Sequence, residues 1–316
     1  MNSLEVAVCT YDRYDLLSKA LESLVCQNSE GFKFDILVVD NTPEAIRKEK
    51  HRFVSELHSN YAGSVRFIVE ETPGLSHARN AAVSNSDADI IAFIDDDACA
   101  KESWAIELIK AFNSQSQVGC VGGRISPIWT QDIPSWLYRD LYGLLSVVDW
   151  GGKTREALES EWFAGANIAF DRRLIKGWGG FNTKLGRIGS GNSLLSNEET
   201  ELLDKIKVSD YKAVYAPDVH VDHLVEEGRL NQNWFRRRMA WQATSDHLVR
   251  DGLMGEDTGS HLENVNKYLS NMPPRYRNIA GLYHEHEDPD MFKWQLSAIY
   301  SFSSLCLSGF PEEQVV

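Results

Sequence analysis

Short apolar runs alternate with amphipathic segments along the first 125 residues of the chain. Apolar runs rich in β-branched residues predict buried strands, which we expect at residues 4–9, 34–39, 65–69, 90–95 and 118–125. Apolar residues at helical spacing predict helices between them, at residues 16–25, 44–58, within 71–83 after a turn, and 102–112. Because strands that alternate with helices favour right-handed crossovers, we expect a mostly parallel, Rossmann-like α/β sheet flanked by helices.

The second half of the chain has a less regular pattern. We expect a loop with short helices at residues 127–142, a strand at 161–170, a helix at 197–207, and a strand, turn and strand at 211–221. From residue 229 onward the pattern is mainly helical, with breaks around residues 252–259 and 272–274. The sequence therefore predicts one α/β domain at residues 1–228 and a helical C-terminal extension at residues 229–316.

Composition and charge narrow the class of protein. The net charge of −14 and the isoelectric point near 5.1 argue against a general nucleic-acid-binding protein. The five cysteines are scattered without a CxxC pair, which indicates a reducing compartment. We find no signal peptide and no apolar span of about 20 residues, so we expect a cytoplasmic protein without a transmembrane segment. The apolar segment 294–310 is expected to pack in a core or dimerise, with docking on a membrane surface as the alternative.

Candidate chemistry gathers where the fourth predicted strand, IIAFI, runs into Asp95, Asp96 and Asp97. Three adjacent carboxylates repel one another, and a divalent cation that carries phosphates would relieve the repulsion. An acidic solvated loop, or a helix N-terminus, is the alternative interpretation. Polar residues also follow the first and second strands, at 10–12 and 40–41, and parallel strands bring all three ends to one edge of the sheet.

Eight short stretches follow one another in an order that resembles a known family. They read VAVCTYDRYDLL, DILVVDN, GLSHARNAAV, AFIDDDA, FAGANIAFDRR, GGFN, NEETEL and VDHLV. The sequence resembles the inverting family 2 glycosyltransferases of the GT-A fold over about residues 4–250. The resemblance implies a nucleotide-binding half at residues 1–125 and an acceptor half at residues 126–228.

The family's DxD motif matches Asp95 and Asp97, with Asp96 as its variable middle residue. The resemblance implies that Asp97 ligates Mn²⁺ or Mg²⁺ on the donor diphosphate, and that Asp95 reaches the ribose or a metal-bound water. His223 stands where many members have a further metal ligand, and imidazole is compatible with Mn²⁺. The alternatives to His223 are a structural role or the neighbouring His220 and Asp222.

The resemblance also implies a set of residues that contact the donor nucleotide and its sugar. They are Thr10, Tyr11, Asp12, Arg13, Asp40, Arg79, Asp95, Asp96, Gly165 and Asn167. Family members usually have Asn where this chain has Asp12, which weakens that contact. The alternative role for Tyr11 is simple packing on the sheet edge. The alternative role for Arg79 is a salt bridge to one of the sheet-edge aspartates.

Glu198 and Glu199 fall where the family usually has Glu-Asp at the start of a helix under the acceptor. By that register Glu199 is the catalytic base, which takes the acceptor hydroxyl's proton during attack. The alternative is that the two glutamates only stabilise the N-terminus of the helix through its dipole. Gly180 and Phe181, together with Glu198, are placed on the acceptor side. The glycine-dense stretch 186–191 is either a lid over the donor or a plain surface loop.

Departures from the family pattern refine the predicted activity. The chain lacks the QxxRW motif of processive members, which favours transfer of a single sugar. We therefore expect metal-dependent, inverting transfer from a nucleoside-diphosphate sugar, most often UDP in similar proteins, to a saccharide acceptor of a cell-surface glycan. The acceptor is free or lipid-linked, and the enzyme is cytoplasmic or peripheral at the inner face of the membrane.

Other readings stay open at this point. A catalytically silent sugar-nucleotide or glycan-binding protein has the same fold, whereas a nucleotidyltransferase should have a glycine-rich loop that TYDRYDLL lacks. The arginines at 236–238 are expected on a solvated helix face, and the sequence HEHED at 284–288 in an exposed linker rather than a second metal site.

Overall fold

The computed structural model describes residues 1–189, 193–249 and 258–309. They form two compact units. The first comprises Met1–Ile128, Ser146–Asn192 and Glu198–Leu224. The second comprises Trp129–Leu145, Ser193–Asn197 and Val225–Val316.

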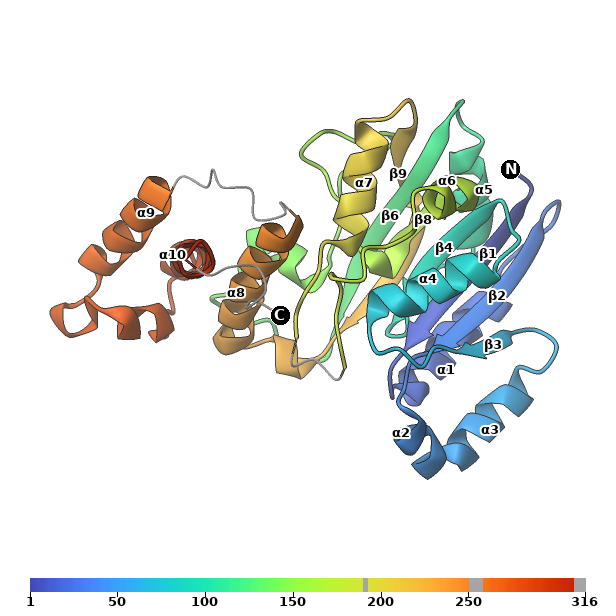
Figure 1. The fold of residues 1–316 in the computed structure, drawn as a ribbon, viewed down its shortest axis with the longest axis horizontal. Coiled ribbons are helices and arrows are strands. Elements are labelled where there is room, and N and C mark those ends of the chain that lie inside the picture. Colours follow the sequence, from blue (N-terminus) through green and yellow to red (C-terminus); the bar gives the residue numbers. More distant parts are fainter. Residues whose placement is uncertain (190–192, 250–257, 310–316) are drawn as a thin grey trace. The chain divides into compact units, whose positions relative to one another are not determined.

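Four parallel strands form the N-terminal part of the sheet in the first unit (Figure 1). They are β1 (Ser3–Thr10), β2 (Lys33–Asp40), β3 (Arg66–Val69) and β4 (Ile90–Asp95), in the order β3-β2-β1-β4. The side chains of β1, β4 and the second half of β2 are mostly apolar and buried, as expected for central parallel strands covered by helices, whereas the edge strand β3 is partly exposed. Thr10 pairs with Asp40 and Cys9 with Asp95. The three polar strand ends therefore meet at one edge, as the sequence predicts.

Strands from the second half join this sheet in antiparallel fashion. β8 (Ile168–Asp171) lies between β4 and β6 (Val118–Trp129). β9 (Lys212–Val225) pairs with the short strands β5 (Ala98–Ala100) and β7 (Arg155–Glu156). The result is a nine-stranded sheet among the described residues, which confirms the α/β class and adds antiparallel strands to its parallel half.

Two expected strands differ in extent. The strand expected at 161–170 is confined to β8, because Gly165–Asn167 turns as a 3₁₀ helix (η2) before it. The turn expected within 211–221 is wrong, since β9 runs straight through Pro217. A proline is tolerated inside a strand wherever its missing N–H is not needed by the ladder.

Helices connect the strands of the first unit. They are α1 (Tyr14–Val25), α2 (Glu44–Glu49), α3 (His51–Asn60), α4 (Leu75–Asn85), α5 (Trp104–Phe112), α6 (Arg172–Gly177) and α7 (Glu198–Lys207). Figure 1 shows α4 crossing in front of the sheet. The single helix expected at 44–58 is wrong, because the chain breaks at Lys50. Leu57 is the buried residue of α3 and α2 buries none of its described residues, so packing does not enforce one straight helix.

The second unit is helical, as the sequence predicts for its C-terminal part. α10 (Pro289–Leu307) packs against α8 (Gln232–Val249) and α9 (Thr258–Asn271). The rings of Trp136, Phe235 and Phe292 form an aromatic cluster with centroids 5.0–6.1 Å apart. α10 thus buries Leu296, Ala298 and Ile299 of the apolar segment expected to form a core, and residue 310 of that segment lies outside the described residues. The break expected at 272–274 follows α9, and most of the one at 252–259 lies outside the described residues.

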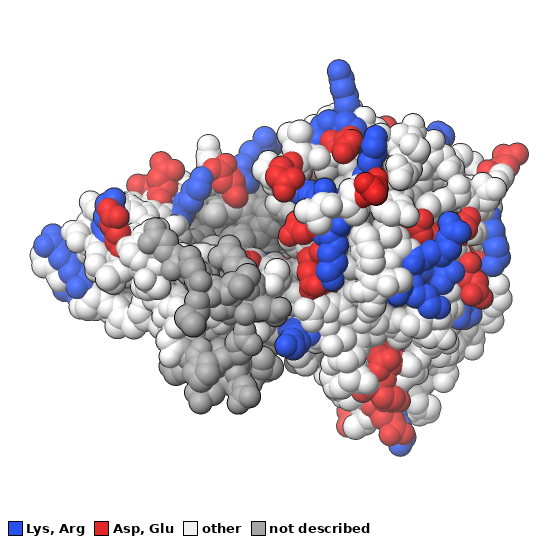
Figure 2. Space-filling model, turned by 45° about the horizontal axis from the view of Figure 1, so that its top comes forward, with Lys and Arg blue, Asp and Glu red and all other residues white. Residues whose placement is uncertain are grey.

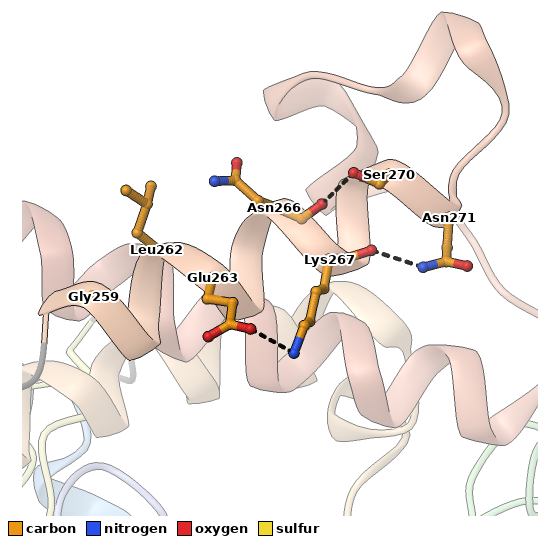
Figure 3. A pocket seen from close by; sticks show the side chains of 7 residues that line it. All are labelled: Gly259, Leu262, Glu263, Asn266, Lys267, Ser270 and Asn271. Carbon is orange, nitrogen blue, oxygen red and sulfur yellow. Dashed lines mark hydrogen bonds and ion pairs between the residues drawn. The ribbon is translucent and has the colours of Figure 1, made fainter.

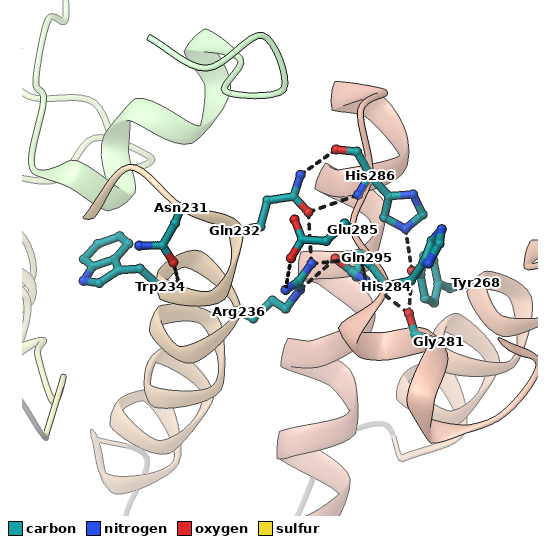
Figure 4. A network of polar contacts seen from close by, with 10 residues as sticks. All are labelled: Asn231, Gln232, Trp234, Arg236, Tyr268, Gly281, His284, Glu285, His286 and Gln295. Carbon is teal, nitrogen blue, oxygen red and sulfur yellow. Dashed lines mark hydrogen bonds and ion pairs between the residues drawn. The ribbon is translucent and has the colours of Figure 1, made fainter. Parts of the chain in front are cut away.

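A buried arginine organises the loop before α10 (Figure 4). Arg236, 5% exposed, donates to Gln232 at 2.9 Å, to the carbonyl of His284 at 2.9 Å and to Glu285 at 3.1 Å. His286 hydrogen-bonds the Tyr268 hydroxyl at 2.8 Å, and burial lowers its pKa. The expectation of a solvated Arg236 is therefore wrong, whereas in the segment 284–288 the three acidic residues are exposed as expected and the two histidines are partly buried. A buried guanidinium needs several acceptors, and this loop supplies them.

One open hollow follows the outer face of α9 (Figure 3). It has a volume of about 490 Å³ and is lined by Gly259, Leu262, Glu263, Asn266, Lys267, Ser270 and Asn271. Its charged groups, Glu263 and Lys267, pair with each other at 2.7 Å in solvent. The hollow therefore offers no convergent chemistry. Among the described helices, none is long and apolar enough to cross a bilayer.

Candidate active site

Two sheet elements bring three potential metal ligands together. Asp95 ends β4, Asp97 follows in the turn to β5, and His223 lies on β9 opposite Ala98. One ligand atom from each of Asp95, Asp97 and His223 lies within 4.8 Å of the others. The side chains of Asp97 and His223 are 2% and 1% exposed, and that of Asp95 is 37% exposed. A ligand could therefore approach from the Asp95 side.

The donor set fits a divalent cation. Nε2 of His223 lies 3.2 Å from Oδ1 of Asp97, and its buried Nδ1 has no hydrogen-bond partner among the described residues. Carboxylate oxygens with one imidazole nitrogen suit Mn²⁺. The alternative metal ligands on β9 have other partners. His220 contacts Ser126 at 2.8 Å, and Asp222 pairs with Lys101. The geometry thus favours His223 over its neighbours.

Asp96 and Arg13 complete the acidic turn. Asp96 accepts a hydrogen bond from Thr10 at 2.7 Å, and Arg13 lies 3.3 Å from Asp96 and 2.9 Å from Asp97. Burial, together with the neighbouring Asp97 carboxylate, raises the pKa of Asp96 to about 7. The turn therefore holds more negative charge than one arginine neutralises, which favours a further cation.

The predicted nucleoside contacts lie at the same sheet edge but differ in what they already bind. Asp40 accepts from the Tyr14 hydroxyl and from the amide of Thr42, each at 2.9 Å. Asp12 has a positive φ of 60° and pairs with Lys50. The Tyr11 hydroxyl lies 3.9 Å from where a Cβ on Gly189 would stand. Of these three, Tyr11 thus lies beside the glycine-dense loop.

Arg79 of α4 lies at the centre of a buried carboxylate cluster. Its Nη1 donates to Glu198 at 2.8 Å and to Glu199 at 2.9 Å, and its Nη2 lies 3.6 Å from Asp95. Burial raises the pKa of Glu198 to about 7, with Glu199 as the second cause and Arg79 opposing it. The side chain of Glu199 is 14% exposed and that of Glu198 is 3% exposed. Of the two, Glu199 is therefore the one that an acceptor can reach.

Charged side chains on the surface contribute less to the stability of the fold than this buried cluster does. Figure 2 shows Lys and Arg side chains lying among Asp and Glu on the face in view. Exposed pairs of this kind, such as Arg52 with Glu56 at 3.1 Å, contribute little to stability. The buried Arg79 differs, because removing one partner would leave carboxylates desolvated and unpaired.

Gly165 is needed where Arg79 meets Glu199. A Cβ there would lie 1.9 Å from Nη2 of Arg79 and 2.1 Å from Oε1 of Glu199. We expect Gly165→Ala to lower the free energy of unfolding by about 1–3 kcal/mol, because the ion pair must move aside. Chemical denaturation measures the change.

Gly177→Ala is the matched control for that substitution. A Cβ on Gly177 meets nothing within 4 Å, so we expect a change within about 0.5 kcal/mol. Equal effects of the two substitutions would contradict the close approach at Gly165.

Three other predicted residues serve the scaffold in this structure. Asn167 uses its whole amide on protein partners, accepting from Trp104 and donating to two backbone carbonyls at 2.8–2.9 Å. Phe181 is buried against Phe93 and Arg79. Gly180 has a positive φ of 79° and packs against Asn80. Because the scaffold engages both polar atoms of the Asn167 amide, a contact of this side chain with the donor is not favoured.

Two asparagines not predicted from the sequence fix backbone segments next to α4, the helix that carries Arg79. Asn41 accepts from the amide of Gly74 at 2.8 Å and so fixes the turn before α4. Asn80 exchanges two 2.8 Å hydrogen bonds with the backbone of Phe181. Their place beside motif residues, in VVDN and HARN, is the signal that could have identified them.

The described part of the glycine-dense loop is anchored. The carbonyl of Arg187 accepts from the amide of Leu75 at 2.9 Å, and Ser76 donates to the carbonyl of Leu185 at 2.7 Å. Residues 190 and 191 lie outside the described residues. A lid at this position stays a prediction.

Comparisons with known proteins identify the family of the chain. Residues 5–174, more than half of the chain, match the family model described as Glycosyl transferase family 2. A glucosyl-dolichyl phosphate glucuronosyltransferase of Haloferax volcanii is 26% identical over 97% of this chain and 95% of its own. The succinoglycan biosynthesis protein ExoM of Rhizobium meliloti is 23% identical over 74% of this chain and 71% of its own.

A solved structure shows the same fold. The mannosyltransferase PcManGT of Pyrobaculum calidifontis, in complex with GDP-Man and Mn²⁺, has a TM-score of 0.58 and 19% identity. The similarity covers 98% of this chain and 87% of that one. It confirms the predicted GT-A fold.

Proposed function

The chain belongs to glycosyl transferase family 2, and we propose that this glycosyltransferase moves one sugar from a nucleoside-diphosphate donor to a saccharide acceptor, with a divalent cation and with inversion at the anomeric carbon. The observation that carries the proposal is one continuous cluster. Asp95 belongs to the ligand group with Asp97 and His223, and it also lies against Arg79, which holds Glu199. Donor and base are thereby brought to one place.

Asp95, Asp97 and His223 are the residues that would hold Mn²⁺ or Mg²⁺. When bound there, the cation would offset the negative charge that grows on the departing diphosphate. Arg13 contacts Asp97 and remains partly exposed, so it stands beside the same phosphates. Tyr11, Thr10 and Asp40 would form the wall of the nucleoside pocket at the carboxyl ends of β1 and β2.

Glu199 is the proposed catalytic base. The acceptor hydroxyl oxygen forms a bond to the anomeric carbon while the carbon–oxygen bond to the diphosphate breaks. The electron pair leaves with the diphosphate, and Glu199 takes the hydroxyl proton. One displacement of this kind inverts the configuration. Glu198 is too deeply buried to reach an acceptor, so its role is to share Arg79 with the base.

The relatives narrow the substrates that we propose. The name of the Haloferax volcanii relative gives glucosyl-dolichyl phosphate as its acceptor and glucuronosyl as the transferred group. We therefore propose a lipid-linked saccharide as the acceptor, in glycan synthesis on the cytoplasmic side of the membrane. The donor that we propose is a UDP-sugar, as the resemblance to family 2 implies. A silent sugar-nucleotide-binding protein is the second candidate, and it would bind the donor without turnover.

A thermal-shift panel tests the donor. We expect one of UDP, GDP, dTDP and CMP, with UDP first, to raise the melting temperature in Mn²⁺ and not in chelator. A ligand present at 100 times its Kd stabilises the folded state by about 2.7 kcal/mol, which is readily measured.

The panel separates the two candidate functions when it is combined with a turnover assay. Release of UDP from UDP-glucuronic acid, measured with glucosyl polyprenyl phosphate as acceptor, supports the enzyme. A Mn²⁺-dependent shift without release of UDP from this or other UDP-sugars supports the silent binder. The absence of any shift with all four nucleotides would contradict both.

A further inference from the structure

Arg79 has an environment that differs from that of a nucleotide contact. Its side chain is 2% exposed, and its guanidinium lies 5.7 Å from the ring of Phe93 and 5.5 Å from the ring of Phe181. The other neighbours of the guanidinium are three carboxylates, those of Asp95, Glu198 and Glu199. To reach a nucleobase or phosphate, Arg79 would have to leave Glu198 and Glu199, which are 3% and 14% exposed, without their cation, which is costly.

We propose that Arg79 is a positioning residue for the base Glu199, aiming its carboxylate and tying it to the metal-side carboxylate of Asp95, and is no contact of the donor nucleotide. The inference rests on the proposed function, because it takes Glu199 as the base. It favours the alternative given for Arg79, a salt bridge to a sheet-edge aspartate, over the donor contact that the resemblance implies.

The guanidinium geometry supports a role in aiming the base. Nη1 donates to both glutamates, whereas Nη2 points towards Asp95. A planar fork fixes the direction of each hydrogen bond, which the compact ammonium of a lysine does not. Glu199 can therefore turn its second oxygen to the acceptor while its first is held.

The surroundings of Arg79 leave it one position. The two phenyl rings flank the guanidinium, and Asn80 clamps the backbone of Phe181 with a pair of hydrogen bonds. Gly165 supplies the space in which Arg79 and Glu199 meet. Burial would lower the pKa of Arg79, but Glu199, Glu198 and Asp95 outweigh it and raise the pKa. The group therefore stays charged and fixed.

Arg79→Lys tests the proposal with two separate quantities. We expect kcat for UDP release from UDP-glucuronic acid, with the polyprenyl acceptor, to fall by about 100-fold, because the base loses its orientation. We expect the Kd for UDP with Mn²⁺, measured by calorimetry, to stay within about threefold of wild type. Where the thermal-shift panel names another nucleotide, that nucleotide and its sugar donor replace UDP in both measurements.

Arg79→Ala with added guanidinium gives a second readout. Guanidinium ions that enter the vacated space should restore part of kcat, and sodium chloride at the same ionic strength should not. A merely structural role would not produce this selectivity. Arg66→Lys is the matched control, since Arg66 pairs with Glu5 at 2.8 Å outside the cluster. We expect its kcat and Kd to be unchanged within about twofold.

The outcomes are distinguishable. A Kd for UDP that rises tenfold or more in Arg79→Lys, with kcat retained, would make Arg79 a nucleotide contact and overturn the inference. Unchanged kcat and Kd would overturn it as well. If Arg79→Ala does not fold, Arg79→Lys alone decides. An active Glu199→Gln enzyme would instead refute the proposed base, whatever Arg79 does.

Discussion

Glu199→Gln is expected to lower kcat for sugar transfer by about 1,000-fold and to leave the Kd for UDP with Mn²⁺ within about threefold. The amide keeps the size of the side chain and can still contact Arg79, but it cannot accept the acceptor's proton. Steady-state turnover and calorimetry on the same preparation measure the two quantities.

Glu201→Gln on the same helix is the control for this substitution. Glu201 pairs with Lys205 at 2.8 Å and does not contact Arg79, so we expect its kcat to remain within about twofold. If Glu199→Gln keeps wild-type turnover, the base lies elsewhere, and Glu198→Gln becomes the next variant to measure.

Asp97→Ala is expected to weaken UDP binding in Mn²⁺ by more than about 100-fold and to remove the difference between Mn²⁺ and chelator. Asp97 is the most buried carboxylate of the ligand group and lies 3.2 Å from His223. Its loss takes away a charged ligand at the centre of the site. Calorimetric titration of UDP, with and without Mn²⁺, measures the effect.

Asp222→Ala removes a carboxylate of the same strand, β9, next to His223. Because Asp222 pairs with Lys101 rather than with the ligand group, we expect it to keep the Mn²⁺ dependence of UDP binding. Equal Kd values for wild type and Asp97→Ala, in both conditions, would contradict the metal assignment.

The parallel half of the fold follows from the sequence because each strand is a short apolar run between clear turns. IIAFI at β4 is buried along its whole length, as its composition predicts. The 44–58 segment misleads because charge pairs such as Lys48 with Glu44 support helix locally without an apolar face to hold one axis. The start of β8 is harder to predict, because the apolar run before it continues through Gly165–Asn167, which forms a 3₁₀ helix instead of strand.

In the site, too, some features follow from the sequence and others do not. Asp95, Asp97 and His223 can be found from short motifs, and the structure brings them together as expected. The direction in which Arg79 points cannot be read from HARN, because it depends on Glu198 and Glu199, which are distant in the sequence. Motifs identify which residue types lie at the strand ends. Which carboxylates an arginine such as Arg79 pairs with is decided by tertiary packing.

Buried polar networks are the least predictable part. Arg236 has basic neighbours in the sequence, which predicts exposure, yet it donates to Gln232, Gln295 and the backbone carbonyl of His284. Charge alone predicts exposure, and several convergent acceptors reverse that prediction.

The separation of Arg79 and Glu199 by 120 positions along the chain has a consequence for synthesis. A chain made from its N-terminus completes the acidic end of β4 long before β9 delivers His223. Early in translation the carboxylates exist without their histidine, and Arg79 exists without its glutamates. The proposed metal site is therefore incomplete until β9 has been made. Because contacts of long sequence separation form slowly, we expect the pairing of β9 with β5 to be a late step in assembling that site.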